Sequence, residues 1–467
     1  MEGQKWKGPK MEGTMKQSLT PESMNATREK LKKANHAFNQ AYAGTSYTRQ
    51  AIHTVYGGAH LFTAQLAQKM SGVALRSLEE YAPRPANLLQ ALGLSDSRAD
   101  VSLWGTVYSR VVEKLKREAV EDFRIDFEDG YGSRPDSEED GHAQSAALEV
   151  AKGMKEKSLP PFIGIRIKPL SEECAERSVR TLDLFLSALF EKTGDQLPEN
   201  FVVTLPKITI VEQSRALNQF LTLIEKQNGL KPGSVKVELM VETPQSILDE
   251  SGASPLRRFV EALEGRCVGA HFGTYDYTAL CNITAAYQSM MSPVCDFAKQ
   301  VMQVSLAGSP VLLSDGATNV MPVGSHRAPP GGALTREQKA ENEAVIHRAW
   351  RLSYSNIRHS LANGYYQGWD LHPGQIPIRY AAVYSFFLES LEPAGQRLKA
   401  FVDKAAKATL SGDIFDDAAT GQGLLNFFLR GISCGAITES EALATGLSIE
   451  DFRGRSFLKI LERRKLV

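Results

Sequence analysis

Acidic side chains stand at two points where strand-like runs of the sequence stop. The stretch KVELMVETPQSIL (236–248) alternates apolar and polar residues up to Val241 and then places Glu242 before a Thr-Pro turn. The stretch CVGAHFGTYDYTA (267–279) has the same form, with Asp276 three residues beyond Gly273. Two carboxylates that leave positions open for water and substrate suit Mg²⁺, with Mn²⁺ as the alternative. Such an ion would chelate a 2-keto acid and act as a Lewis acid for an enolate.

A plainer interpretation of these two acids stays open. Glu242 is then a solvated strand end and Asp276 the N-cap of the following helix. Spacing alone does not decide between the two interpretations.

Charged residues end other strand-like runs as well. Arg166 lies near the end of FIGIRI (162–167), where an arginine among apolar residues would bind a substrate carboxylate or an enolate oxygen, or form an interior salt bridge. In RIDFEDGYG (124–132), Glu128 and Asp129 lie close to Asp126, so a nearby cation is expected. Lys207 in TLPKITI is a candidate for that cation, either at the site or in a plain ion-pair network.

Two histidines are weaker candidates. His372 in WDLHPGQIPI either contacts substrate or closes its own loop, and we favour the loop role. His53 in AIHTVYGG is expected to be a core histidine rather than a base.

The elements that would carry these residues alternate in type along the chain. Eight strand candidates are separated mostly by helical patterns: 51–58, 123–129, 162–167, 201–207, 236–242, 267–273, 310–316 and 364–370. This alternation predicts parallel pairing and an α/β fold, specifically a (β/α)₈ TIM barrel whose mouth gathers the strand ends. A doubly wound open sheet is the rival, but it usually has fewer strands, and no GxGxxG follows a strand here.

Three regions are predicted. Residues 1–48 hold a polar tail and a helix that opens with Thr20 as N-cap and runs to about Tyr42. Residues 49–385 form the barrel, with a long Gly- and Pro-rich loop at 316–345. Residues 386–467 contain no clear strand and are expected to be a helical lid or oligomerisation segment.

Bulk composition narrows the class of protein. The 467 residues carry 54 basic and 54 acidic side chains, so no net positive charge favours nucleic acid. Five cysteines without a CxxC pair indicate reduced thiols. We expect a cytoplasmic protein, because neither a signal peptide nor an apolar run long enough to span a membrane is evident.

Six motifs in order resemble those of one known family. IDFEDGYG is similar to its D-L-E-D motif, GIRIKPL to V-R-x-N, LPKITIVEQ to P-K-V, LMVETPQSI to I-E-T, FGTYDYTA to F-G-x-x-D-L and LHPGQI to I-H-P-x-Q. Together, over about residues 50–385, they resemble the citrate-lyase beta-subunit and pyruvate-releasing aldolase family of the phosphoenolpyruvate/pyruvate barrel superfamily. Departures are HTVYGGAHLF in place of a Pro-Gly opening, the extended stretch 59–120 and the long loop.

The resemblance implies roles for individual residues. Glu242 and Asp276 match the family's metal ligands, and Arg166 matches the arginine that contacts the keto-acid oxygen. Glu128 and Asp129 match acids beside the metal, and Lys207 matches a lysine behind them. Gly273, Thr274 and His372 fall in substrate-contacting motifs. GDIFDDAATGQGLLNFFLRGISCGA resembles a closing segment, often donated by a neighbouring subunit, and makes Asp416 the first and Asp417 the second candidate for its aspartate.

The implied function is a Mg²⁺-dependent carbon–carbon lyase or aldolase acting on a 2-keto or 2-hydroxy acid or its CoA thioester. A lid carboxylate such as Asp416, or a water, would take the substrate's hydroxyl proton. A malate-synthase-like condensation of an acyl-CoA with glyoxylate, or a non-catalytic keto-acid-binding barrel, are the alternatives. By resemblance we also expect a homo-oligomer.

Overall fold

The computed structural model describes residues 18–42, 44, 49–95, 101–403, 409–411, 414–416, 418–454 and 460. They fall into two compact units, and each is described by itself. The smaller unit lies within Met1–Thr45 and Ala307–Pro310. Its helix α1 (Pro21–Ala41) begins as predicted, with Thr20 as N-cap accepting a hydrogen bond from Ser23 N. Gly44 N donates to Gly308 O within the same unit.

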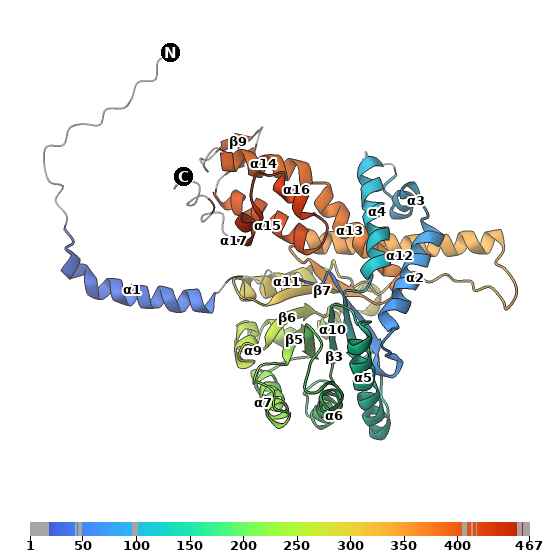
Figure 1. The fold of residues 1–467 in the computed structure, drawn as a ribbon, viewed down its shortest axis with the longest axis horizontal. Helices are drawn as coiled ribbons and strands as arrows, with labels where there is room; N and C mark the ends of the chain where they lie inside the picture. Colours follow the sequence, from blue (N-terminus) through green and yellow to red (C-terminus); the bar gives the residue numbers. More distant parts are fainter. Residues whose placement is uncertain are drawn as a thin grey trace, which may run out of the picture. The chain divides into compact units, whose positions relative to one another are not determined.

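The larger unit is built on a closed barrel of eight parallel strands (Figure 1). They are β1 (His53–Gly58), β2 (Asp122–Asp126), β3 (Phe162–Arg166), β4 (Phe201–Leu205), β5 (Lys236–Val241), β6 (Cys267–Phe272), β7 (Leu312–Ala317) and β8 (Gln367–Asp370). Each strand pairs with the next, and β1 also pairs with β8. The predicted (β/α)₈ fold is therefore confirmed, and the open-sheet alternative is wrong because the first and last strands meet.

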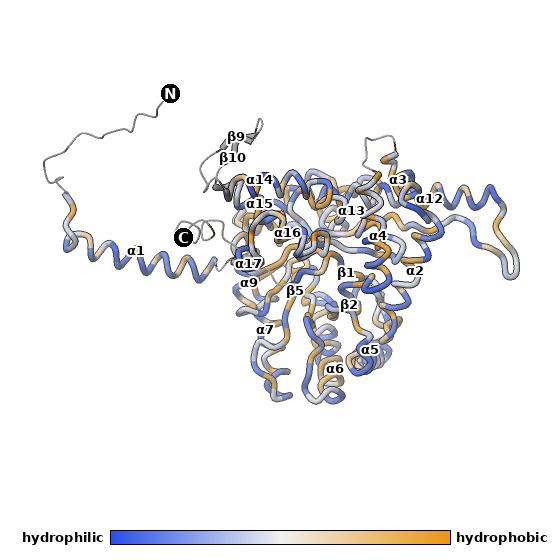
Figure 2. The backbone as a smooth tube through the Cα atoms, turned by 45° about the horizontal axis from the view of Figure 1, so that its top comes forward, coloured by the Kyte–Doolittle hydropathy of each residue, from blue (hydrophilic) through white to orange (hydrophobic). Residues whose placement is uncertain are grey.

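Helices surround the strands because each carries one apolar face. The helices between the strands are α2 (Leu66–Tyr81), α3 (Pro85–Leu92), α4 (Val101–Glu118), α5 (Asp136–Glu156), α6 (Ala175–Thr193), α7 (Val211–Gln227), α8 (Pro244–Ile247), α9 (Leu256–Ala262), α10 (Thr274–Leu280), α11 (Pro293–Leu306) and α12 (Arg336–Ala362). In α6, for example, Leu182, Phe185 and Leu189 face the core, while Asp183 lies between them on the solvent side. In Figure 2 the tube of the helices changes repeatedly between the hydrophilic and the hydrophobic colour, as expected for helices with one apolar face. No helix among the described residues is long and apolar enough to cross a membrane.

Two local predictions need correction. The long loop covers residues 318–335 only, because α12 starts at Arg336 behind the N-cap Thr335. The region after the barrel is mainly helical but contains a two-stranded antiparallel sheet, because β9 and β10 pair directly with each other.

The elements after β8 are α13 (Ile376–Leu388), α14 (Leu391–Asp403), β9 (Thr409–Ser411), β10 (Ile414–Asp416), α15 (Ala418–Ser433), α16 (Glu439–Leu443) and α17 (Ile449–Gly454). Helix α15 ends beside the residues that precede β1. Arg430 Nη1 donates to Gln50 Oε1 at 3.1 Å, and Gln50 N lies 3.5 Å from Ser433 Oγ. The end of α15 thus contacts the amino-terminal face of the barrel, opposite the face where the strands end.

The barrel interior is polar rather than filled with branched apolar side chains. Arg124 of β2 is buried between Asp122 and Glu238, and it also donates to Thr204 Oγ1 at 3.1 Å. His271 Nε2 lies 3.0 Å from Glu238 Oε2. This network is fully paired, which is the condition for keeping charges inside a core. It forms the layer beneath the strand ends that carry the predicted site.

Candidate functional site

Glu242 and Asp276 lie at the carboxyl ends of neighbouring strands. Glu242 directly follows β5, and its residue surface is only 1% exposed. Asp276 lies in the first turn of α10, after β6, and its side chain is 38% exposed. Both plainer interpretations are wrong in detail, because Glu242 is buried rather than solvated and the N-cap of α10 is Gly273. The two carboxylates interact electrostatically across this edge of the barrel.

Gly273 leaves room for the Glu242 side chain because it has no Cβ atom. A Cβ atom on Gly273 would lie 2.5 Å from the Cβ of Glu242 and would also overlap its Oε2. The backbone φ of Gly273 is −100°, which any residue adopts, so the glycine is required by this close approach and not by the turn. Gly273 therefore shapes the pocket around the buried carboxylate.

Lys207 reaches the same place from the end of β4. Its backbone N donates to Glu242 Oε1 at 2.8 Å. Its ammonium contacts Glu128 Oε1, lies 3.2 Å from Asp129 Oδ2 and lies 3.6 Å from Asp276 Oδ1. Burial alone would lower the pKa of Lys207, but Glu242 and Glu128 outweigh it and hold the pKa above its usual value. The predicted cation beside the acids of the second strand is Lys207.

Arg166, the last residue of β3, is held by three neighbouring side chains. Its Nε and Nη2 donate to both oxygens of Asp126 at 2.7 and 2.5 Å. Its Cζ lies 4.8 Å from the ring centre of Tyr56, and its Nη1 lies 3.0 Å from Glu128 Oε2. The interior salt bridge considered for this arginine exists, and Nη1 is the part of the guanidinium not used by Asp126.

These contacts define a carboxylate cluster with too few cations. Its members are Asp126, Glu128, Asp129, Glu242 and Asp276, together with Arg166 and Lys207. Three negative charges are left unbalanced when all five acids are ionised. Burial and the charge of Asp276 raise the pKa of Glu242 to about 8. Burial also raises the pKa of Glu128, whereas Arg166 and Lys207 outweigh burial at Asp129 and lower its pKa.

The cluster fits a hard divalent cation. Among the described residues, no group of three or more His, Cys, Asp and Glu side chains has the geometry of a metal site. Mg²⁺, however, is commonly held by one or two carboxylates and completes its shell with water and substrate oxygens. Two oxygen ligands from Glu242 and Asp276, in a cluster with unbalanced negative charge, suit that ion.

The remaining predicted residues are placed as follows. Thr274, at the first position of α10, is buried, and its hydroxyl has no hydrogen-bond partner among the described residues. His372 caps the turn η3 (Pro373–Gln375) by accepting from Gly374 N at 3.0 Å, as in the loop role. His53 is buried at the start of β1 and bonds Asp370, so its assignment to the core is confirmed. The backbone of Asp416 lies in β10; its side chain, and Asp417 as a whole, lie outside what the structure describes.

Tyr56 is a site residue that the sequence analysis missed. It faces the barrel interior beneath Arg166, with its ring centre 4.9 Å from that of Trp369. Its buried hydroxyl has no hydrogen-bond partner in the part of the chain that the structure describes. The signal was available, because in HTVYGG the side chains of Thr54 and Tyr56 alternate with Val55 and share the interior side.

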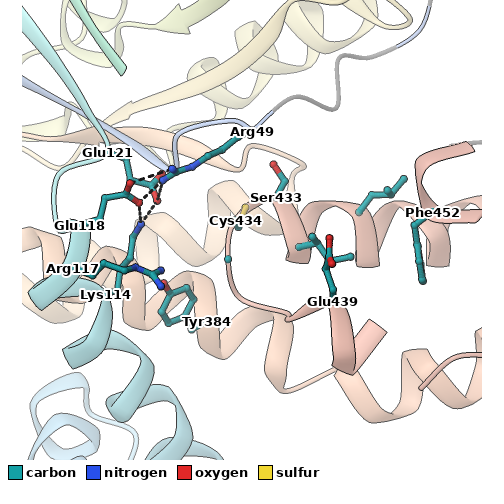
Figure 3. Close-up of a pocket in the computed structure, with 13 residues that line it drawn as sticks. Arg49, Lys114, Arg117, Glu118, Glu121, Tyr384, Ser433, Cys434, Glu439 and Phe452 are labelled. Carbon is teal, nitrogen blue, oxygen red and sulfur yellow. Dashed lines mark hydrogen bonds and ion pairs between the residues drawn. The ribbon is translucent and has the colours of Figure 1, made fainter. Parts of the chain in front are cut away.

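A cavity of about 550 Å³ lies away from this cluster (Figure 3). Its lining includes Lys114 and Glu118 of α4, Glu121 before β2, Arg49 before β1, and Cys434 after α15. Four of these charges pair among themselves, with Lys114 Nζ 2.6 Å from Glu121 Oε1 and Arg49 Nη2 2.5 Å from Glu118 Oε2. Arg49 and Glu121 precede their strands, so this cavity borders the amino-terminal face and is separate from the candidate site.

A family model described as "Domain of unknown function (DUF6986)" matches residues 31–460. The chain belongs to the DUF6986 family. That description assigns no activity to its members. No curated protein sequence matches this chain.

Solved structures resemble this DUF6986 member at low sequence identity. A citrate lyase from Burkholderia xenovorans LB400 is 17% identical, with 85% of this chain and 96% of that chain covered and a TM-score of 0.51. The Haloferax volcanii malate synthase in a magnesium/glyoxylate complex is 14% identical, with 87% of this chain and 97% of that chain covered and a TM-score of 0.45. CitE from Mycobacterium tuberculosis with magnesium, acetoacetate and coenzyme A is 14% identical, with 84% of this chain and 99% of that chain covered and a TM-score of 0.44. The first likeness shows the fold alone, and the other two are too weak to carry an argument.

Proposed function

We propose that this DUF6986 protein is a Mg²⁺-dependent carbon–carbon lyase acting on a 2-keto or 2-hydroxy acid or its CoA thioester. One observation carries the proposal. Glu242 and Asp276, from consecutive βα units, share a cluster with Arg166 and Lys207 in which negative charge exceeds positive charge. The motif resemblance to citrate-lyase beta subunits agrees with this chemistry.

Glu242 and Asp276 would hold the divalent ion, which when bound would polarise the substrate's keto or hydroxyl oxygen. Arg166 would donate from Nη1 to the oxygen on which negative charge develops. Asp126 fixes this guanidinium through two hydrogen bonds, so its direction is set before the substrate arrives. A guanidinium already oriented in this way loses little freedom when the reaction occurs.

Glu128 is the described group best suited to accept the hydroxyl proton. Its Oε2 is buried and lies 3.0 Å from Arg166 Nη1, and burial raises the pKa of this carboxyl group, which makes the carboxylate a stronger base. Cleavage then breaks the carbon–carbon bond, the keto acid forms, and the departing enolate takes up a proton. Run in reverse, the same residues would join an acyl-CoA to glyoxylate.

Turnover of a defined panel tests the proposal. The protein with Mg²⁺ is incubated with malyl-, citramalyl- and citryl-CoA and with 4-hydroxy-2-keto acids, and keto-acid release is followed. The reverse assay uses glyoxylate with acetyl-CoA and detects free thiol. We expect turnover that EDTA abolishes and that Glu242→Gln lowers at least about 100-fold. The matched control is Glu261→Gln, which changes an exposed carboxylate on α9.

One result would overturn the lyase assignment: Mg²⁺-dependent binding of pyruvate with no turnover anywhere on the panel, which would indicate a non-catalytic keto-acid-binding barrel. Full activity of Glu242→Gln would overturn the assignment of Glu242 as a metal ligand. A homo-oligomer whose C-terminal segment closes the neighbour's site remains part of the proposal, and analytical ultracentrifugation measures the oligomeric state.

A further inference from the structure

Lys207 contacts four of the five acids in the carboxylate cluster. Its ammonium touches Glu128 and Asp129 and lies 3.6 Å from Asp276. Its backbone N donates to Glu242 Oε1 at 2.8 Å. Both proposed metal ligands are therefore engaged by one residue, one through the side chain and one through the main chain.

The backbone of Lys207 is held in an unusual conformation to make these contacts. Its φ is +50°, in the left-handed region that residues other than glycine rarely adopt. The hydrogen bond from its backbone N to the buried Glu242 belongs to this conformation. Local sequence does not favour it, because Pro206 and Ile208 on either side are extended-chain residues. Thr243 Oγ1 donates to Ile208 O at 2.8 Å, so contacts from residues 242 and 243 help to hold the lysine in this conformation.

We propose that Lys207 is a built-in counter-cation that competes with the divalent ion for these carboxylates and so sets how tightly the ion binds. The inference rests on the metal site of the proposed function. The ammonium satisfies part of the negative charge that would otherwise attract the ion, and it repels a second cation brought nearby. Arg166 also carries a positive charge beside the cluster, but its ion pairs among the described residues are with Asp126, Glu128 and Asp129 and not with the proposed metal ligands.

The competing role makes a prediction opposite to that of a simple positioning role. If Lys207 only held Glu128 and Asp129 in place, removing it would weaken metal binding. If it competes, removing its charge leaves a more negative cluster that binds the ion more tightly. The two roles therefore differ in the sign of the change in affinity.

Mg²⁺ titration by calorimetry on EDTA-treated, desalted protein separates these roles, with Mn²⁺ titration followed by electron paramagnetic resonance as a second readout. We expect Lys207→Met to lower the dissociation constant at least about tenfold. Lys207→Arg keeps the charge and should stay within about threefold of wild type. The matched control is Lys231→Met, which alters an exposed lysine before β5 and should leave the dissociation constant unchanged.

Thermal unfolding provides a measurement independent of activity. In EDTA, Lys207→Met should melt below wild type because the carboxylates repel one another without the lysine. Mg²⁺ should raise its melting temperature by more than it raises that of wild type. Should Lys207→Met fail to fold, Lys207→Gln, which keeps a hydrogen-bond donor without the charge, tests the same point.

The outcomes separate this inference from the lyase proposal. Equal or weaker Mg²⁺ binding by the uncharged variants overturns it, even when wild type turns over a substrate with Mg²⁺. Tighter binding supports it, even when no substrate on the panel is cleaved. If neither wild type nor any variant binds Mg²⁺, both the competing role of Lys207 and the Mg²⁺-dependent lyase function are refuted.

Discussion

Replacing Glu242 with glutamine should remove the proposed function while making the protein more stable. Burial and the charge of Asp276 raise the pKa of Glu242 to about 8. In the unfolded chain the pKa of a glutamate is about 4.3. Between these pH values the folded state binds a proton that the unfolded state has lost. The free energy of unfolding of the metal-free wild type therefore falls as the pH rises through this range.

The size of the effect follows from the same shift. At pH 7 the unfavourable contribution of Glu242 is on the order of 3 kcal/mol, and at pH 4 it is close to zero. Glutamine carries no charge at any pH, and its Oε1 can still accept the bond that Lys207 N makes in the wild type at 2.8 Å. In EDTA we expect Glu242→Gln to exceed wild type in stability by about this amount at pH 7 and to equal it near pH 4.

Urea unfolding in EDTA at several pH values, followed by circular dichroism, measures this difference. Glu261→Gln, in which the altered carboxylate is exposed on α9, should follow wild type throughout. Mg²⁺ should stabilise wild type but not Glu242→Gln. If Glu242→Gln is less stable than wild type at pH 8, Glu242 is instead held as a carboxylate by Lys207 and Arg166. The cluster then carries no unbalanced negative charge at Glu242, and the proposed metal site is refuted.

Three further variants test other parts of the structure. Gly273→Ala pushes a Cβ into Glu242, so Mg²⁺ affinity should fall at least about tenfold by calorimetry, whereas Gly105→Ala, with open space around it, should leave affinity unchanged. Arg166→Lys loses the paired bonds to Asp126 and should weaken Mg²⁺-dependent pyruvate binding at least about tenfold, and unchanged binding would count against its role. Burial would raise the pKa of Asp370, but its arginine and histidine partners outweigh it and lower the pKa to about 2. Asp370→Asn should therefore lose stability at pH 7, and acid titration should show the gap to wild type closing as the pH falls from about 4 to 2.

The strands and the place of the charged residues along them could be read from the sequence. Short apolar runs separated by amphipathic helical patterns predict eight strands, and parallel pairing brings their carboxyl ends to one edge. That is why Arg166, Glu242 and Asp276 could be expected together before any distance was known. The helix start at Thr20 was equally readable, because capping depends on neighbouring residues alone.

Contacts between distant segments and very short elements could not be read from the sequence. The antiparallel pair β9 and β10 has three residues in each strand, too few for a periodic signal. The unpartnered hydroxyl of Tyr56 depends on which side chains surround it inside the closed barrel. Burial of Glu242 depends on a glycine thirty-one residues further along the chain.

The sequence by itself determined the barrel and the order in which its acids and cations follow the strands, because those depend on local alternation and on one pairing rule. Only the tertiary structure decided the electrostatics. Closing the barrel excludes water from Glu242, turns Lys207 into a left-handed conformation and leaves five carboxylates facing two cations. These properties depend on distances between strand ends and on solvent exclusion, which spacing along the chain does not encode.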